Sequence, residues 1–187
     1  QMDAHGDGVA SHIAVDSDGY IVLVHSTRGA MPGETHHGEE DIVVWRFDPQ
    51  GRALWTRQFG TTGNDRVNRL RLDDTGDIYL AGATFGALSG AYQGMEDLFL
   101  MKLSTGGSVL WQRQVGTGGD DSADGMVITP DGGVVIAGTV AGLIGASHGG
   151  SLDWLVRKYS ATGAVLWTVQ IGGPAEDRAV AVASDDA

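Results

Sequence analysis

Acidic residues recur in short glycine-containing turns, where their carboxylates could serve as calcium ligands. Asp16 and Asp18 precede a glycine, and Asp73 and Asp77 lie in a similar acidic turn. Calcium takes about six to eight oxygen ligands, and neither turn continues into a loop of alternating ligands that ends in a bidentate glutamate. Tight turns favour Asp and Gly in any case. Turn chemistry and a calcium site therefore both stay open as interpretations of these positions.

Two adjacent histidines, His36 and His37, lie among glutamates and could in principle bind zinc. Adjacent spacing is a weak metal motif, and solvated loop histidines are the simpler interpretation. His148 stands alone in another loop. We therefore expect no metal site here, and calcium remains the one cofactor that the sequence keeps open.

Several classes of function are excluded by composition. The chain has no cysteine, which rules out disulfides, thiolate metal sites and cysteine nucleophiles. The net charge is −12 and the isoelectric point is about 4.6, which argue against nucleic acid or an anionic membrane as a partner. The glycine-rich phrases do not lead into helices, so phosphate binding is not expected. The uncharged window 132–152 is too rich in glycine for a membrane span.

Three copies of one unit, 56 residues long, account for most of the chain. Each copy contains a short phrase centred on Leu-Trp, as in VLWQRQVG, with a glutamine three residues after the tryptophan. The landmarks that keep this spacing are Trp55, Trp111 and Trp167; Asp41, Asp97 and Asp153; Asp65, Asp121 and Asp177; and Gln58, Gln114 and Gln170. Four landmarks in register make the repeat a specific signal.

Each unit is expected to form four short strands. In the second copy these are 67–73, 78–84, 97–103 and 108–115, and their lengths and strand-forming residues fit strands rather than helices. Some are apolar throughout, which suits strands buried on both faces. The prediction is an all-β fold of β-propeller blades, each with four antiparallel strands.

The predicted blades span about 9–60, 66–116 and 122–172, and 178–185 aligns with the first strand of a further blade. Three blades cannot close a ring, because propellers need about four to eight. The chain is therefore expected to be part of a longer propeller or part of an oligomeric ring. Its first partners would be the remaining blades or a second copy.

The repeat resembles bacterial propeller repeats of the SBBP type. The resemblance covers essentially the whole chain, although the first copy lacks the Ala-Gly pair and has a longer middle loop. The residues that carry it include Gly94, Asp97, Lys102, Trp111, Gln114, Gly116, Asp131, Gly132, Ala137, Gly138 and Thr139. The resemblance implies a secreted or cell-surface protein, with the periplasm as the alternative, and it implies no particular activity.

A second resemblance concerns the phrase SATGAVLWTVQIGG, which is similar to the tryptophan-docking phrase of pyrroloquinoline-quinone propeller repeats. Such repeats occur in quinone-dependent dehydrogenases and in outer-membrane assembly propellers. The main expectation is a non-enzymatic binding or scaffold module. The alternative is a fragment of a quinone-dependent propeller enzyme or of an outer-membrane assembly propeller. The repeated tryptophans are expected to pack between blades, with ligand stacking as the other reading. The repeated aspartates are expected to accept backbone N–H bonds, with an acidic ring around a channel as the other reading.

Strand direction places the long loops 27–40, 84–96 and 140–152 on one face and the tight turns on the other. Binding residues concentrate on long loops held by a rigid scaffold, so we expect a protein or glycan ligand to bind the long-loop face. The candidate binding residues are Arg28, His36, His37, Glu39, Tyr92, Gln93, Glu96 and His148.

Overall fold

The computed structural model describes residues 10–145, 148–179 and 182–183. Over these residues the chain forms twelve β-strands and no helix, and therefore no helix that could cross a membrane. The strands are β1 (Ala10–Val15), β2 (Ile21–Thr27), β3 (Asp41–Phe47), β4 (Ala53–Phe59), β5 (Asp65–Leu72), β6 (Ile78–Thr84), β7 (Asp97–Leu103), β8 (Val109–Val115), β9 (Ser122–Ile128), β10 (Val134–Val140), β11 (Asp153–Tyr159) and β12 (Val165–Ile171).

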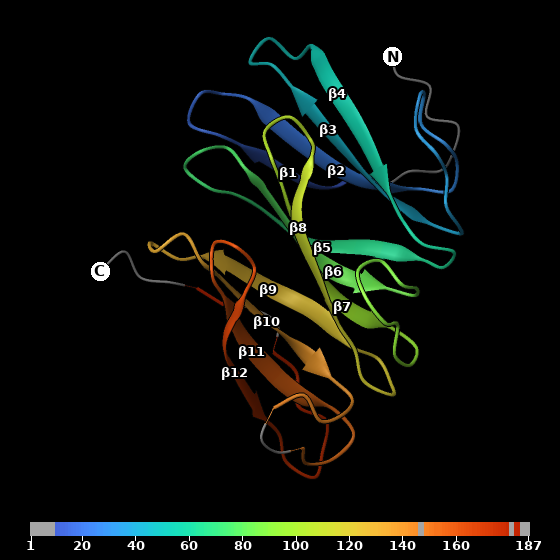
Figure 1. The fold of residues 1–187 in the computed structure, drawn as a ribbon, viewed down its shortest axis with the longest axis vertical. Coiled ribbons are helices and arrows are strands. Elements are labelled where there is room, and N and C mark those ends of the chain that lie inside the picture. Colours follow the sequence, from blue (N-terminus) through green and yellow to red (C-terminus); the bar gives the residue numbers. More distant parts are fainter. Residues whose placement is uncertain (1–9, 146–147, 180–181, 184–187) are drawn as a thin grey trace.

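The strands form three separate four-stranded sheets, which follow one another along the molecule (Figure 1). Within each sheet the strands lie in chain order and every neighbouring pair is antiparallel. The all-β prediction and the three four-stranded units are thus confirmed. The first strands β1, β5 and β9 contact one another in sequence, so they lie innermost, and β4, β8 and β12 lie at the outer edges.

An irregularity in the first strand of each sheet explains the Ala-Gly pair of the repeat. The register shifts between Val67 and Arg69 opposite Gly82, and the third sheet shifts in the same way opposite Gly138. A Cβ on Gly82 would overlap the carbonyl oxygen of Arg66, so the close approach of the two backbones requires glycine there. In the first sheet His25 takes this position.

Apolar side chains are buried mainly between the sheets. One cluster joins the first two sheets and includes Val24, Ile42 and Met101, and a second cluster joins the second and third and includes Leu100 and Leu155. Each sheet therefore buries a face only against its neighbour, as in repeat architectures.

The further strand expected over 178–185 falls in part on residues that are not described. The described residues of this range, 178–179 and 182–183, lie in no strand. Just before this range, Leu152 and Glu176 form an isolated bridge, as Glu40 and Asn64 and then Glu96 and Asp120 do after the first and second sheets.

Candidate functional site

An Asp–Gln pair fixes each long loop from inside. In the second sheet Gln114 Nε2 donates to Asp97 Oδ2 at 2.7 Å and to the carbonyl of Gly86 at 2.8 Å, and its Oε1 accepts from the amide of Ser89 at 2.8 Å. Asp97 is fully buried and also accepts from the amide of Gln93 at 3.1 Å. One amide side chain thus ties the loop 84–96 to β7 and β8.

The same brace recurs in the other two sheets. Gln58 and Gln170 donate to Asp41 and Asp153 at 2.7 and 2.8 Å. Their Oε1 atoms accept from loop amides, that of Met31 at 2.9 Å in the first sheet and those of the third-sheet loop at 2.7–2.8 Å. Three loops of different sequence therefore share one internal support.

Asp65 and Asp121 secure the start of the inner strands β5 and β9, and Asp177 takes the equivalent position after β12. Asp121 is buried and accepts from Thr117 N and Oγ1 at 2.5 and 2.9 Å and from the amide of Ala141 at 3.0 Å. Burial raises the pKa of Asp121 to about 6 and raises that of Asp65 in the same direction. Asp177 accepts from the amide of Gly173 at 2.6 Å but is only half-buried.

The candidate residues of the first long loop face different surroundings. Arg28 is exposed, and His36 is half-buried. His37 Nδ1 lies 3.2 Å from the buried carboxylate of Asp41, so this histidine supports the loop as well as facing solvent. Glu39 accepts from Asn64 Nδ2 at 2.8 Å and thereby links the loop to the start of the second sheet.

The candidates of the other two loops are likewise tied locally. The Tyr92 hydroxyl donates to the carbonyl of Met95, and Glu96 forms an ion pair with Arg66. His148 Nδ1 lies 3.0 Å from Asp153 Oδ2, which repeats the His37 contact. Gln93 keeps its side chain exposed. Within the described residues, no hydrogen bond or ion pair joins candidates of one long loop to those of another.

Two exposed apolar side chains on the long loops, Met95 and Leu143, were missing from the sequence-based candidates, whereas Tyr92 was among them. Met95 is 60% exposed, Leu143 is 64% exposed and Tyr92 is 38% exposed. Methionine and tyrosine are enriched at protein interfaces. The signal available in the sequence was an apolar residue within a polar loop segment. The candidates were chosen for side chains with chemical function, and that choice passes over apolar residues.

A small polar hollow of about 170 Å³ lies where the long-loop ends of the first and second sheets meet. Ser26 donates to Glu40 at 2.7 Å on one side, and Arg66 and Asn68 line the other. His25, at the position occupied by glycine in the other sheets, accepts from Trp45 Nε1 at 3.1 Å. None of these residues was a sequence-based candidate.

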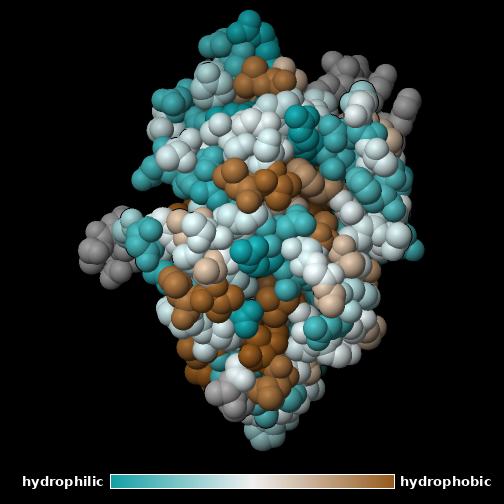
Figure 2. All heavy atoms as spheres, viewed as in Figure 1, coloured by the Kyte–Doolittle hydropathy of each residue, from teal (hydrophilic) through white to brown (hydrophobic). Residues whose placement is uncertain are grey.

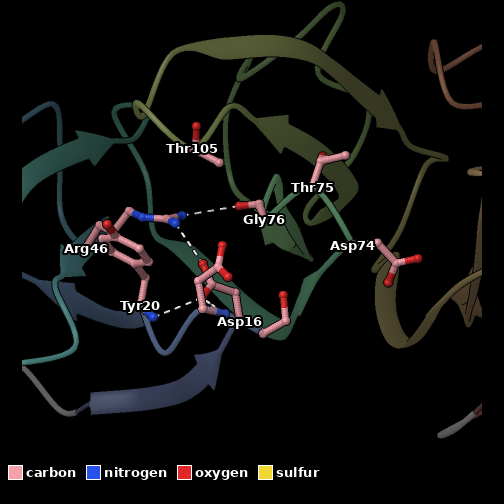
Figure 3. A pocket seen from close by; sticks show the side chains of 9 residues that line it. Asp16, Tyr20, Arg46, Asp74, Thr75, Gly76 and Thr105 are labelled. Atoms are coloured by element: carbon pink, nitrogen blue, oxygen red, sulfur yellow. Dashed lines mark hydrogen bonds and ion pairs between the residues drawn. The ribbon is translucent and has the colours of Figure 1, made fainter.

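Two larger hollows lie on the opposite face, between the tight turns. One, of about 330 Å³, lies between the β1–β2 and β5–β6 turns (Figure 3). Another, of about 600 Å³, lies between the β5–β6 and β9–β10 turns. In the first, Arg46 Nη2 contacts Asp16 Oδ2 at 2.8 Å, Nη1 donates to the carbonyl of Gly76 at 3.2 Å, and the guanidinium lies over the Tyr20 ring. The tight-turn face is therefore hollowed, and Arg46 in the first hollow is already paired with groups of the two turns.

The aspartates considered for calcium take part in these turn contacts. Asp16 accepts from the amides of Asp18 and Tyr20, and Asp73 accepts from the amides of Thr75 and Asp77. A cation from the third strand of each sheet completes the turn: Arg46 on Asp16, Lys102 on Asp73 and Asp77, and Lys158 on Asp131. Among the described residues, no three His, Asp or Glu side chains form a group that could hold a metal ion.

The repeated tryptophans connect each sheet to the next. Trp55 Nε1 donates to the carbonyl of Thr105 at 3.0 Å, and Trp111 Nε1 donates to that of Ala161 at 2.9 Å. Each indole lies against the glycine of the same turn, Gly107 or Gly163. Trp167, on β12, is 43% exposed.

No family model matches the chain. A search of curated proteins finds regulatory protein FlaEY of Caulobacter vibrioides, which is 30% identical over 151 residues, 72% of this chain. The aligned part covers 16% of that relative, so the chain corresponds to a small part of its length.

Proposed function

We propose that the three sheets are consecutive blades of a β-propeller and that the chain is a non-enzymatic binding module of the cell surface or extracellular space. The chain-order sheets, the innermost first strands and the apolar contacts between sheets support the propeller. The resemblance to SBBP-type repeats supports the location.

The internal bracing of the long loops is the observation that carries the binding proposal. The same buried Asp–Gln pair holds all three loops, whereas their exposed side chains differ between sheets. A rigid scaffold that presents variable loops is the usual arrangement of a recognition surface. The ligand face is therefore 27–40, 84–96 and 140–152.

The partner that fits this face best is a protein. Tyr92, Met95 and Leu143 supply exposed apolar contacts, and the surrounding acidic residues favour a partner with basic groups. The relative from Caulobacter vibrioides is named a regulatory protein, and regulation through protein binding agrees with such a role.

The proposal is tested by affinity capture from source-cell extracts with quantitative mass spectrometry. The triple variant Tyr92→Ser, Met95→Ser and Leu143→Ser should lose the captured partner. A matched variant of the tight-turn face, Asp18→Ser and Asp74→Ser, should keep it, because both residues are exposed there. Loss of the partner only in the tight-turn variant would overturn the assignment of the face.

A quinone-dependent role is the second candidate, and the docking of tryptophan on a glycine turn of the next sheet favours it. Reconstitution with pyrroloquinoline quinone would then give a bound chromophore and a shifted absorbance spectrum. A spectrum equal to that of free quinone would remove this candidate.

A further inference from the structure

The same contact joins the first sheet to the second and the second sheet to the third. The first and third sheets each carry, on the side away from the second sheet, residues equivalent to one half of that contact. Between neighbouring sheets, the fourth strand of one sheet places its Trp against the β-turn of the next. Figure 2 shows apolar residues over the lower part of the molecule, where Figure 1 places β9–β12. The third sheet has no further described sheet on this side.

The exposed half on the third sheet is a row of alternating residues on β12. Trp167, Val169 and Ile171 are 42–48% exposed and point to one side of the strand, since alternate residues share a face and these three pair with β11 in regular register. The corresponding residues of β8, Trp111 and Val115, are packed against the cluster between the second and third sheets.

The exposed half on the first sheet lies on β1. Ile13 is 68% exposed and Val15 is 60% exposed. Their counterparts in β5 include Leu70, which is buried against the first sheet. An apolar residue is therefore exposed at this position only where no preceding sheet covers it.

The β3–β4 turn of the first sheet has an open site for a tryptophan. Gly51 has φ of 78°, close to the 80° and 77° of Gly107 and Gly163. A Cβ on Gly163 would lie 2.8 Å from Trp111 Cδ2, whereas a Cβ on Gly51 would have no described heavy atom within 4 Å. The carbonyl of Pro49 takes the place of the acceptors at Thr105 and Ala161.

We propose that the chain associates head to tail with a second copy, in which Trp167 docks on the turn at Gly51. A heterologous contact of this kind closes when rotation allows. Two copies would give six sheets, within the about four to eight of closed propellers, so we expect a closed dimer.

This inference rests on the observed contacts between sheets and not on the proposed ligand face. Light scattering over a concentration series should therefore show a mass near twice 19.5 kDa for the wild-type chain. Trp167→Glu and Ile13→Glu should each weaken association by about thirtyfold or more, as expected for a hot-spot residue.

Leu166 provides the matched control. It is 54% exposed, and its equivalents Leu54 and Leu110 are 51% and 50% exposed although a further sheet follows theirs, so this position lies outside the interface. Leu166→Glu should leave the dimer unchanged.

Mixing the two interface variants tests the orientation. Trp167→Glu chains keep an intact first-sheet face and Ile13→Glu chains keep an intact β12 face, so the mixture should form a heterodimer that neither variant forms alone. A wild-type chain that stays monomeric at its highest soluble concentration would overturn the proposal. A dimer blocked by only one of the two variants would overturn the head-to-tail geometry.

Discussion

The indole of Trp111 lies against Gly163, a turn residue of the next sheet, and donates its Nε1 hydrogen to Ala161 in the same turn. Arg113, two residues along β8, donates to the carbonyl of Gly163 at 2.7 Å. A contact between a fourth strand and the following β-turn therefore links the second and third sheets at their outer edge. The apolar cluster between the same sheets supplies the burial that stabilises the stack.

Removing the brace of the second long loop should destabilise the protein. Gln114→Leu leaves the buried carboxylate of Asp97 without its closest donor and frees the loop amide of Ser89. We expect a loss of about 2–3 kcal/mol in the free energy of unfolding, measured by urea denaturation. Gln93→Leu, a change of an exposed side chain, should cost no more than about 0.5 kcal/mol. Equal losses would contradict the role of the brace.

Substitution of Gly82 should strain the second sheet. Gly82→Ala introduces a methyl group that overlaps the Arg66 carbonyl, so the two backbones must separate. We expect a destabilisation of about 1–3 kcal/mol in a thermal or urea melt. Gly118→Ala is the control, because a Cβ there meets no described heavy atom within 4 Å. An unchanged melt for Gly82→Ala would show that the backbone approach is not tight.

The raised pKa of Asp121 predicts a specific pH dependence. The native state binds a proton at this group with a pKa of about 6, whereas the unfolded state has an ordinary value of 3.8. Its contribution to stability is therefore fully present below the unfolded pKa and is lost as the pH rises through about 6. Relative to Asp121→Asn, the wild type should gain stability from about pH 7 to about pH 5. A difference in unfolding free energy that is equal at both pH values would contradict this.

Calcium should have little effect on stability. Asp16 is paired with Arg46, and Asp73 with Lys102, so these carboxylates already have cationic partners. We expect that calcium added to a chelator-treated sample leaves the Tm unchanged in differential scanning calorimetry. A Tm that rises with calcium concentration would instead support the calcium interpretation of these turns.

Sequence periodicity predicted the strands well because the pattern that sets them is local. The landmarks Trp111 and Asp97 recur at a constant spacing, and each four-stranded unit appears in the structure as a sheet. The need for glycine at Gly82 was not evident, because it arises from a register shift in the neighbouring strand.

The candidate surfaces were less predictable because they depend on contacts between distant residues. His37 and His148 were chosen for their chemistry, yet both contact a buried aspartate at the base of their loops. Met95 and the hollows between the tight turns depend on how loops and neighbouring sheets are placed, which the repeat pattern does not give.

Trp55 and Trp111 each lock one sheet to the next, and β12 carries the equivalent Trp167 without a described neighbouring sheet. The most direct test compares Trp111→Ala with Trp167→Ala by urea denaturation, at a concentration where light scattering shows monomers. Both remove the same indole from the same strand position. Trp111→Ala should cost about 3–5 kcal/mol, and Trp167→Ala should cost less than about 1 kcal/mol. Equal losses for the two variants would contradict the account.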